Sequence, residues 1–158
     1  MTAAAALMIS YVEHLLPSFV PLPGVKPGFA NIAVTLAFAI SPSCALAVSL
    51  VRIFTFALLF GTPVSLAMSL CGGLFSYFFL FAAHRVHPRR VSFVGLSVLS
   101  AFFHNAGQLV AAALLADTVG VIAYLPVLTL SGAVCGTLSG LLLNYVYPSL
   151  SRYIKKAV

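Results

Sequence analysis

Charged residues are scarce in this chain, and that scarcity limits what it can fold into. The sequence has eight Lys and Arg residues and two acidic residues in 158 positions, so 6% of it is charged while 62% is hydrophobic. A domain of this size cannot bury that much apolar surface and still cover its outside with polar groups. The sequence therefore predicts one integral membrane domain over residues 1–158.

Six of the eight basic residues fall into two short clusters. They are Arg85, Arg89 and Arg90, followed by Arg152, Lys155 and Lys156. Lys and Arg in short loops tend to remain on the cytoplasmic side of a membrane, where anionic lipid headgroups attract them. We therefore expect a multi-pass protein of the cytoplasmic (inner) membrane with both termini in the cytoplasm. We expect no nucleic-acid partner, because these residues have no soluble face to occupy.

Proline, glycine and charged residues divide the apolar sequence into six expected helices, and a spanning helix needs about 20 mainly apolar residues. The expected helices are Thr2–Leu16, Phe29–Ile40, a third that ends at Phe60, Val64–Ala83, Ser92–Ala116 and Tyr124–Tyr147. Residues 17–28 hold four prolines and two glycines, which predicts a structured loop. Pro148 is expected just past the end of the sixth helix. The predicted fold class is an all-α, six-helix transmembrane bundle.

Small residues recur every four positions on several expected helices, where they let a neighbouring helix approach closely. The sixth helix carries Gly132, Gly136 and Gly140. The fourth carries Ser65, Ser69 and Gly73, and the first carries Thr2, Ala6 and Ser10. For the fourth and sixth helices we interpret these stripes as packing surfaces within the bundle.

Polar residues on the expected helices predict a binding site. Arg52 lies midway along the third helix, where a charge costs about 2.5 to 3.5 kcal/mol and needs a partner, a watery cavity or a ligand. Ser100, His104 and Gln108 recur at four-residue spacing on the fifth helix, beside Asn105. This stripe is expected to face protein or ligand rather than lipid.

Three more polar residues are expected near the outer side of the membrane. Glu13 lies near the end of the first helix, Lys26 in the proline-rich loop and Asn31 at the start of the second helix. We expect a pocket that opens outward, in which Lys26 and Arg52 suit an anionic group and Glu13 or His104 positions a donor. Alternatively, Glu13 and Arg52 neutralise each other, while the polar residues of the fifth helix form hydrogen bonds between helices.

Catalysis is the weaker interpretation of this sequence. The two acidic residues, Glu13 and Asp117, are more than a hundred positions apart, so they do not form an Asp-rich magnesium site. The chain has no GxxxxGK[ST] phosphate loop, and its three cysteines are isolated from one another and from histidines. We therefore expect no catalytic residue, no metal site and no cofactor.

Two stretches carry a resemblance to a known family. They are LPGVKPGFANI at residues 22–32 and HNAGQL at residues 104–109. Together they resemble the Gx transporter family, also labelled heptaprenyl diphosphate synthase component I, whose members are similar to the substrate-binding S components of energy-coupling factor (ECF) transporters.

The resemblance implies a six-helix fold with a ligand pocket near the outer surface. The positions that match its motifs are Lys26, Asn31, His104, Asn105 and Gln108. It also implies that small residues of the first helix dock on a transmembrane ECF coupling subunit, which works with ATPases. Thr2, Ala3, Ala6 and Ser10 match that expectation.

Two functions stay open. The first is a substrate-binding subunit that takes up a small polar or anionic solute with an ATP-driven ECF-type module. The second is a non-catalytic membrane subunit of a flavin, quinone or isoprenoid (heptaprenyl diphosphate) system, which needs the same apolar bundle without transport. Prenyl synthases bind diphosphate through magnesium and clustered aspartates, so a synthase containing this chain would need a second subunit for its chemistry.

Overall fold

The computed structural model is almost entirely helical over the residues that it describes, which are 7–8, 11–12, 31–86 and 92–157. Its elements are α2 (Asn31–Ile40), α3 (Pro42–Phe60), α4 (Pro63–Val86), α5 (Phe93–Leu115), the 3-10 helix η1 (Val119–Tyr124) and α6 (Leu125–Ala157). Of the first expected helix, only residues 7–8 and 11–12 are described. The all-α class is confirmed, whereas the count of six helices and the orientation of the termini stay predictions.

Four helices within the described residues are long and apolar enough to cross a membrane. These segments are Pro42–Phe60, Pro63–Arg85, Phe93–Leu115 and Val119–Pro148. Large hydrophobic side chains such as Leu58 and Leu114 are exposed on their outward faces, where lipid rather than water is their suitable neighbour. The chain is therefore a multi-pass membrane protein.

The residues that interrupt the apolar sequence also set the helix ends. Ser41 has extended backbone angles, Pro42 begins α3, and Gly61 follows its last residue. The hydroxyl of Ser92 accepts a hydrogen bond from the N–H of Gly95 at 3.1 Å, which caps the start of α5. The predicted bounds of these helices are thereby confirmed to within a few residues.

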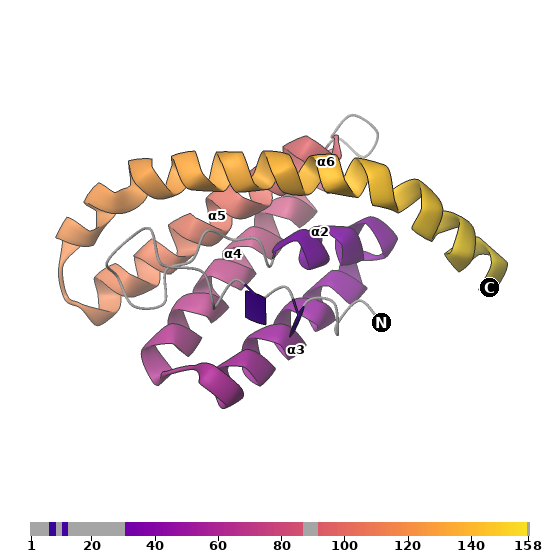
Figure 1. Cartoon of the computed structure of the whole chain (residues 1–158). Coiled ribbons are helices and arrows are strands. Elements are labelled where there is room, and N and C mark those ends of the chain that lie inside the picture. The colour runs from indigo at the N-terminus through magenta and orange to yellow at the C-terminus, as the bar shows by residue number, and fades with distance from the viewer. Residues whose placement is uncertain (1–6, 9–10, 13–30, 87–91, 158) are drawn as a thin grey trace.

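The predicted end of the sixth helix was wrong. Pro148 lies inside α6, which continues to Ala157 and has 33 residues. A proline removes one helical hydrogen bond and favours a bend, but here the helix resumes after it. At 1.5 Å per residue α6 is about 50 Å long, compared with a hydrocarbon core of about 30 Å. Its carboxyl-terminal end accordingly projects beyond the other helices (Figure 1).

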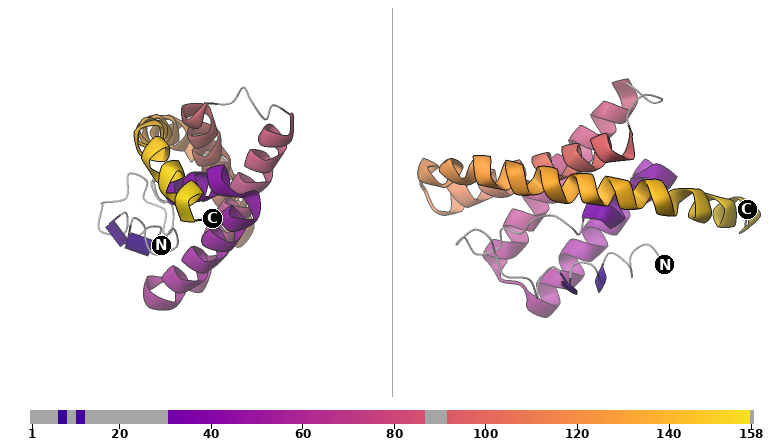
Figure 2. Two further views of the ribbon diagram at one scale, coloured as in Figure 1. Left: turned by 90° about the vertical axis from the view of Figure 1, so that its right-hand side faces the viewer. Right: turned by 45° about the horizontal axis from the view of Figure 1, so that its top comes forward.

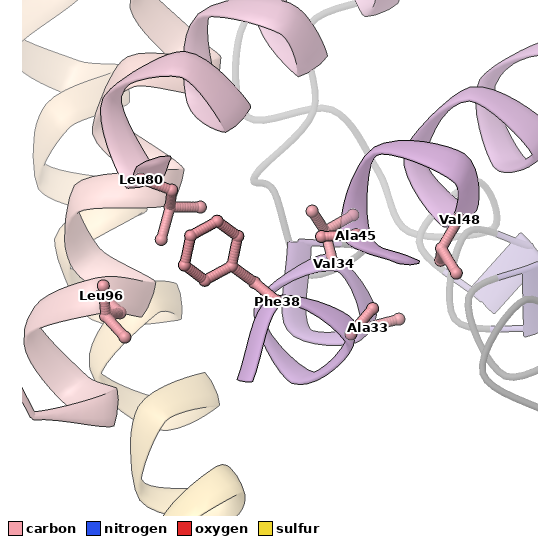
Figure 3. Close-up of a cluster of buried hydrophobic side chains, with 8 residues drawn as sticks. Ala33, Val34, Phe38, Ala45, Val48, Leu80 and Leu96 are labelled. Atoms are coloured by element: carbon pink, nitrogen blue, oxygen red, sulfur yellow. The ribbon is translucent and has the colours of Figure 1, made fainter. Parts of the chain in front are cut away.

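Consecutive long helices pack side by side, and the short helix α2 packs on α3 while also contacting α5 and α6 (Figures 1 and 2). One apolar cluster gathers Phe38 of α2, Leu80 of α4 and Leu96 of α5 with smaller residues of α2 and α3 (Figure 3). A second cluster joins α4, α5, η1 and α6 around Met68 and Leu128.

The glycine stripe of α6 packs against α5, as predicted. A Cβ atom added to Gly136 would lie 2.7 Å from the Cα of Val98, and one added to Gly140 would collide with the backbone of Val94. At Gly132 the added atom would lie 2.9 Å from the Nδ2 of Asn105. The two helices therefore approach each other backbone to backbone along this line.

Candidate functional site

Arg52 and His104, predicted from separate segments, are both buried close to the middle of their helices. Arg52 is 7% exposed on α3, and His104 is 5% exposed on α5. Within the described helices α3 contacts α2 and α4, and its backbone does not contact α5. Both α3 and α5 pack against α4, so Arg52 and His104 lie on two helices that flank the same neighbour.

Two adjacent glycines of α4 make room for this site. A Cβ atom on Gly72 would lie 3.0 Å from the Cε1 of His104 and 2.9 Å from the Cγ of Gln108. A Cβ atom on Gly73 would lie 3.2 Å from the hydroxyl of Ser49 on α3. Polar side chains from α3 and α5 thus lie against bare backbone on two sides of α4.

Sequence reasoning missed Gly72. Each glycine inside a helix costs about 1 kcal/mol relative to alanine, so the adjacent pair Gly72 and Gly73 was an available signal. Gly107 completes this close approach, because a Cβ atom there would lie 2.9 Å from the Cα of Gly72. The HNAGQL stretch therefore supplies both polar side chains and the space for them.

Some of the buried polar groups connect helices to one another. The hydroxyls of Ser76 and Ser100 lie 2.7 Å apart and join α4 to α5. The side-chain amide of Asn105 donates to the carbonyl of Leu128 on α6 at 2.8 Å. For Asn105 the structure thus agrees with the alternative prediction of a hydrogen bond between helices.

Other buried polar atoms have no hydrogen-bond partner among the described residues. They include Asn31 Nδ2, Thr35 Oγ1, Ser97 Oγ, His104 Nδ1 and Asn105 Oδ1. Buried polar atoms are nearly always hydrogen-bonded, and leaving one without a partner costs about 1 to 3 kcal/mol. A run of such atoms is typical of a region that binds water or a ligand.

Asn31 and Arg52 lie at similar distances from the break between α2 and α3. Asn31 is buried at the start of α2, and at 1.5 Å per residue it lies about 15 Å along that helix from Ser41. Arg52 lies a similar distance beyond Ser41 on α3. The depth of these residues in the membrane stays a prediction.

Several predicted residues lie outside the described part of the chain. They are Glu13 and Lys26 of the proposed pocket and Thr2, Ala3, Ala6 and Ser10 of the proposed docking stripe. Asp117 is described and is exposed just past the end of α5, with a φ of 47°. Among the described residues, no group of three or more His, Cys, Asp or Glu side chains is placed to hold a metal ion.

The chain matches the model of a known protein family. The model of the family described as heptaprenyl diphosphate synthase component I matches residues 2–146, which include both stretches that carried the resemblance. No curated protein and no protein of solved structure matches the chain.

Proposed function

This chain belongs to the heptaprenyl diphosphate synthase component I family, and on that premise we propose that it is a solute-binding subunit with the role of an ECF S component. The bundle has six spans in the cytoplasmic membrane, with both termini inside. It captures a small polar or anionic solute from the outer side. An ATP-driven module delivers the solute inward through a coupling subunit that docks on the first helix.

The cluster of buried polar residues on α2, α3 and α5 is the observation that carries this proposal. A helix bundle that needs only adhesion pairs its polar groups with one another, as Ser76 and Ser100 do. The cluster instead joins Arg52 and His104 to several polar atoms that have no partner among the described residues. A guanidinium group binds carboxylate and phosphate with two parallel hydrogen bonds, which favours an anionic group on the solute.

We propose that the chain itself is not an enzyme. The features named above bind and orient a solute, and none of them activates a nucleophile or a leaving group. Lys26 and Glu13 are proposed to complete the pocket from the outer side, together with Asn31 and Gln108. We propose that the pocket opens outward because the basic clusters of the sequence favour cytoplasmic termini.

Binding by the purified protein tests the proposal. A panel of vitamins, flavins and anionic metabolites is screened against the wild type and against Arg52→Ala and His104→Ala. We expect at least one compound to bind saturably and each variant to weaken its binding at least tenfold, which corresponds to about 1.4 kcal/mol.

Thr137→Ala is the control, because Thr137 is exposed and donates to the carbonyl of Ala133 in its own helix. This variant should bind like the wild type. The proposal is contradicted if no panel compound binds saturably, or if both site variants bind as tightly as Thr137→Ala.

The description of the matching family favours a second candidate function. As a component I, the chain would be the non-catalytic membrane subunit of a prenyl-diphosphate synthase or of a related flavin or quinone system. Co-purification from native membranes separates the candidates. A coupling subunit and ATPases support solute uptake, whereas a prenyl synthase or a flavoprotein supports the second function.

A further inference from the structure

Further polar side chains are buried on α2 and α5, two helices that contact each other. Asn31 and Thr35 are one turn apart on α2, and Ser97 lies two turns before His104 on α5. Thr35 is 0% exposed and Ser97 is 3% exposed. We call Asn31, Thr35 and Ser97 the α2–α5 polar seam.

The surrounding contacts place the two sides of this seam at the same level. α2 contacts α5, and Phe38 of α2 shares one apolar cluster with Leu96 of α5 (Figure 3). Thr35 lies one turn before Phe38, and Ser97 directly follows Leu96. One residue joins α2 to α3 and two join α3 to α4, and the contacts Gly72–Gly107 and Ser76–Ser100 show that α4 and α5 are antiparallel. Because α2 and α5 therefore run in opposite directions, both polar residues lie on the His104 side of the Phe38–Leu96 contact.

The apolar cluster closes the seam at the end of the bundle where α4 ends and α5 begins. The ring of Phe38 lies edge-on to Tyr77 and His84 of α4, with ring centroids 6.3 and 5.6 Å apart. Leu80 and Leu96 pack around the same ring (Figure 3). The seam therefore lies inside the bundle, on the His104 side of this cluster, and is not part of the surface at the helix ends.

The hydroxyls of the seam differ from those of α6. Thr129, Thr137 and Ser139 each donate to the carbonyl four residues earlier, at 2.7, 2.7 and 2.6 Å. Such a bond within the helix is the usual way to satisfy a hydroxyl in a membrane. Thr35 Oγ1 and Ser97 Oγ make no such bond and have no partner among the described residues.

We propose that the α2–α5 polar seam is a hydrated subsite that receives an uncharged, hydrogen-bonding part of the solute. The amide of Asn31 donates hydrogen bonds, while the hydroxyls of Thr35 and Ser97 donate or accept them. Arg52 and His104 hold the anionic part of the same molecule, which rests on the proposed function. The expected substrate class is a small anion that also carries hydroxyl, carbonyl or amide groups.

Thiol labelling tests whether the seam is hydrated without requiring the solute. Cys44, Cys71 and Cys135 are first replaced, and Thr35→Cys or Ser97→Cys is introduced in that background. The probe is a small hydrophilic methanethiosulfonate, applied to the full chain in liposomes. The rate of labelling is followed by intact mass.

Ser139→Cys is the matched control, because Ser139 is 4% exposed and its hydroxyl is bonded within α6. We expect the seam thiols to react at least tenfold faster than this equally buried thiol. Equal rates for all three would overturn the proposal. Asn31→Cys serves as the second seam variant if either of the other two fails to yield folded protein.

The labelling experiment tests the hydrated subsite, and the solute-binding experiment tests the proposed function, so the two can be contradicted separately. Rapid labelling of the seam, together with solute binding that is unchanged in Arg52→Ala and His104→Ala, would support the hydrated subsite and contradict the anion site. Slow labelling, together with solute binding that is weaker in Arg52→Ala and His104→Ala, would contradict the hydrated subsite and support the anion site.

Discussion

The two sides of α5 are built differently, although both are buried in the same membrane. Toward α6 the contact is close and dry, with Gly136 against the backbone of Val98 and Asn105 donating to a carbonyl. Toward α4 the contact is also close, at Gly107 and Gly72, and the hydroxyls of Ser76 and Ser100 are paired. Toward α2, by contrast, the hydroxyls of Thr35 and Ser97 have no partner among the described residues. Close packing and paired polar groups hold membrane helices together, so the contacts with α6 and α4 are adhesive, whereas we propose that the α2 side is kept for binding.

The largest expected effect would come from disrupting the close contact between α5 and α6. Gly136→Ala places a methyl group 2.7 Å from the Cα of Val98, so α5 and α6 must separate. We expect a loss of about 3 kcal/mol in the free energy of unfolding, measured by denaturant titration in detergent. In Gly120→Ala the nearest atom, a Thr118 hydroxyl, is 3.5 Å away, so this control should change stability by less than about 0.5 kcal/mol. Similar losses in both variants would contradict the comparison.

A smaller change is expected on the binding side. Thr35→Val replaces a buried hydroxyl that has no partner among the described residues with a methyl group of similar volume. Because water in the proposed subsite already bonds this hydroxyl, we expect the free energy of unfolding to change by less than about 1 kcal/mol, and we expect weaker solute binding. Thr129→Val is the control, because it removes a bond to the carbonyl of Leu125. If Thr35→Val destabilises the protein more than this control does, the seam is structural.

The smallest effect concerns the bond between α4 and α5. The hydroxyls of Ser76 and Ser100 are 2.7 Å apart and buried, and such bonds in membrane proteins contribute on average about 0.6 kcal/mol. A double-mutant cycle with Ser76→Ala and Ser100→Ala should give a coupling energy of that size. Pairing Ser100→Ala with Thr137→Ala should give none. A coupling energy of zero in the first cycle would show that this bond does not help to hold α4 and α5 together.

Most helix ends could be predicted because local chemistry sets them. Pro42, Gly61 and Ser92 begin, end or cap helices through their own backbone preferences, and those preferences are visible in the sequence. Pro148 could not be judged in the same way, because a proline inside a helix is tolerated wherever the remaining bonds re-form around it. The resulting length of α6 is set by its context.

The site was predictable only in part, for a related reason. Four-residue spacing identified the His104 and Gln108 face of α5, and Ser97 lies on that same face. Spacing within one helix does not reveal which neighbour a face meets. The role of Gly72 and the contact of α2 with α5 therefore depend on how the helices pack, which the pattern of a single helix does not contain.

The length of α6 has a mechanical consequence. Its contact with α5 at Gly132, Gly136 and Gly140 fixes the amino-terminal half of the rod to the helix that carries His104. The other half reaches past the hydrocarbon layer. If the pair tilts by about 5°, the far tip of a rod about 50 Å long swings by about 4 Å. The tip near Ala157 would thus move further than the part of α6 that packs against α5.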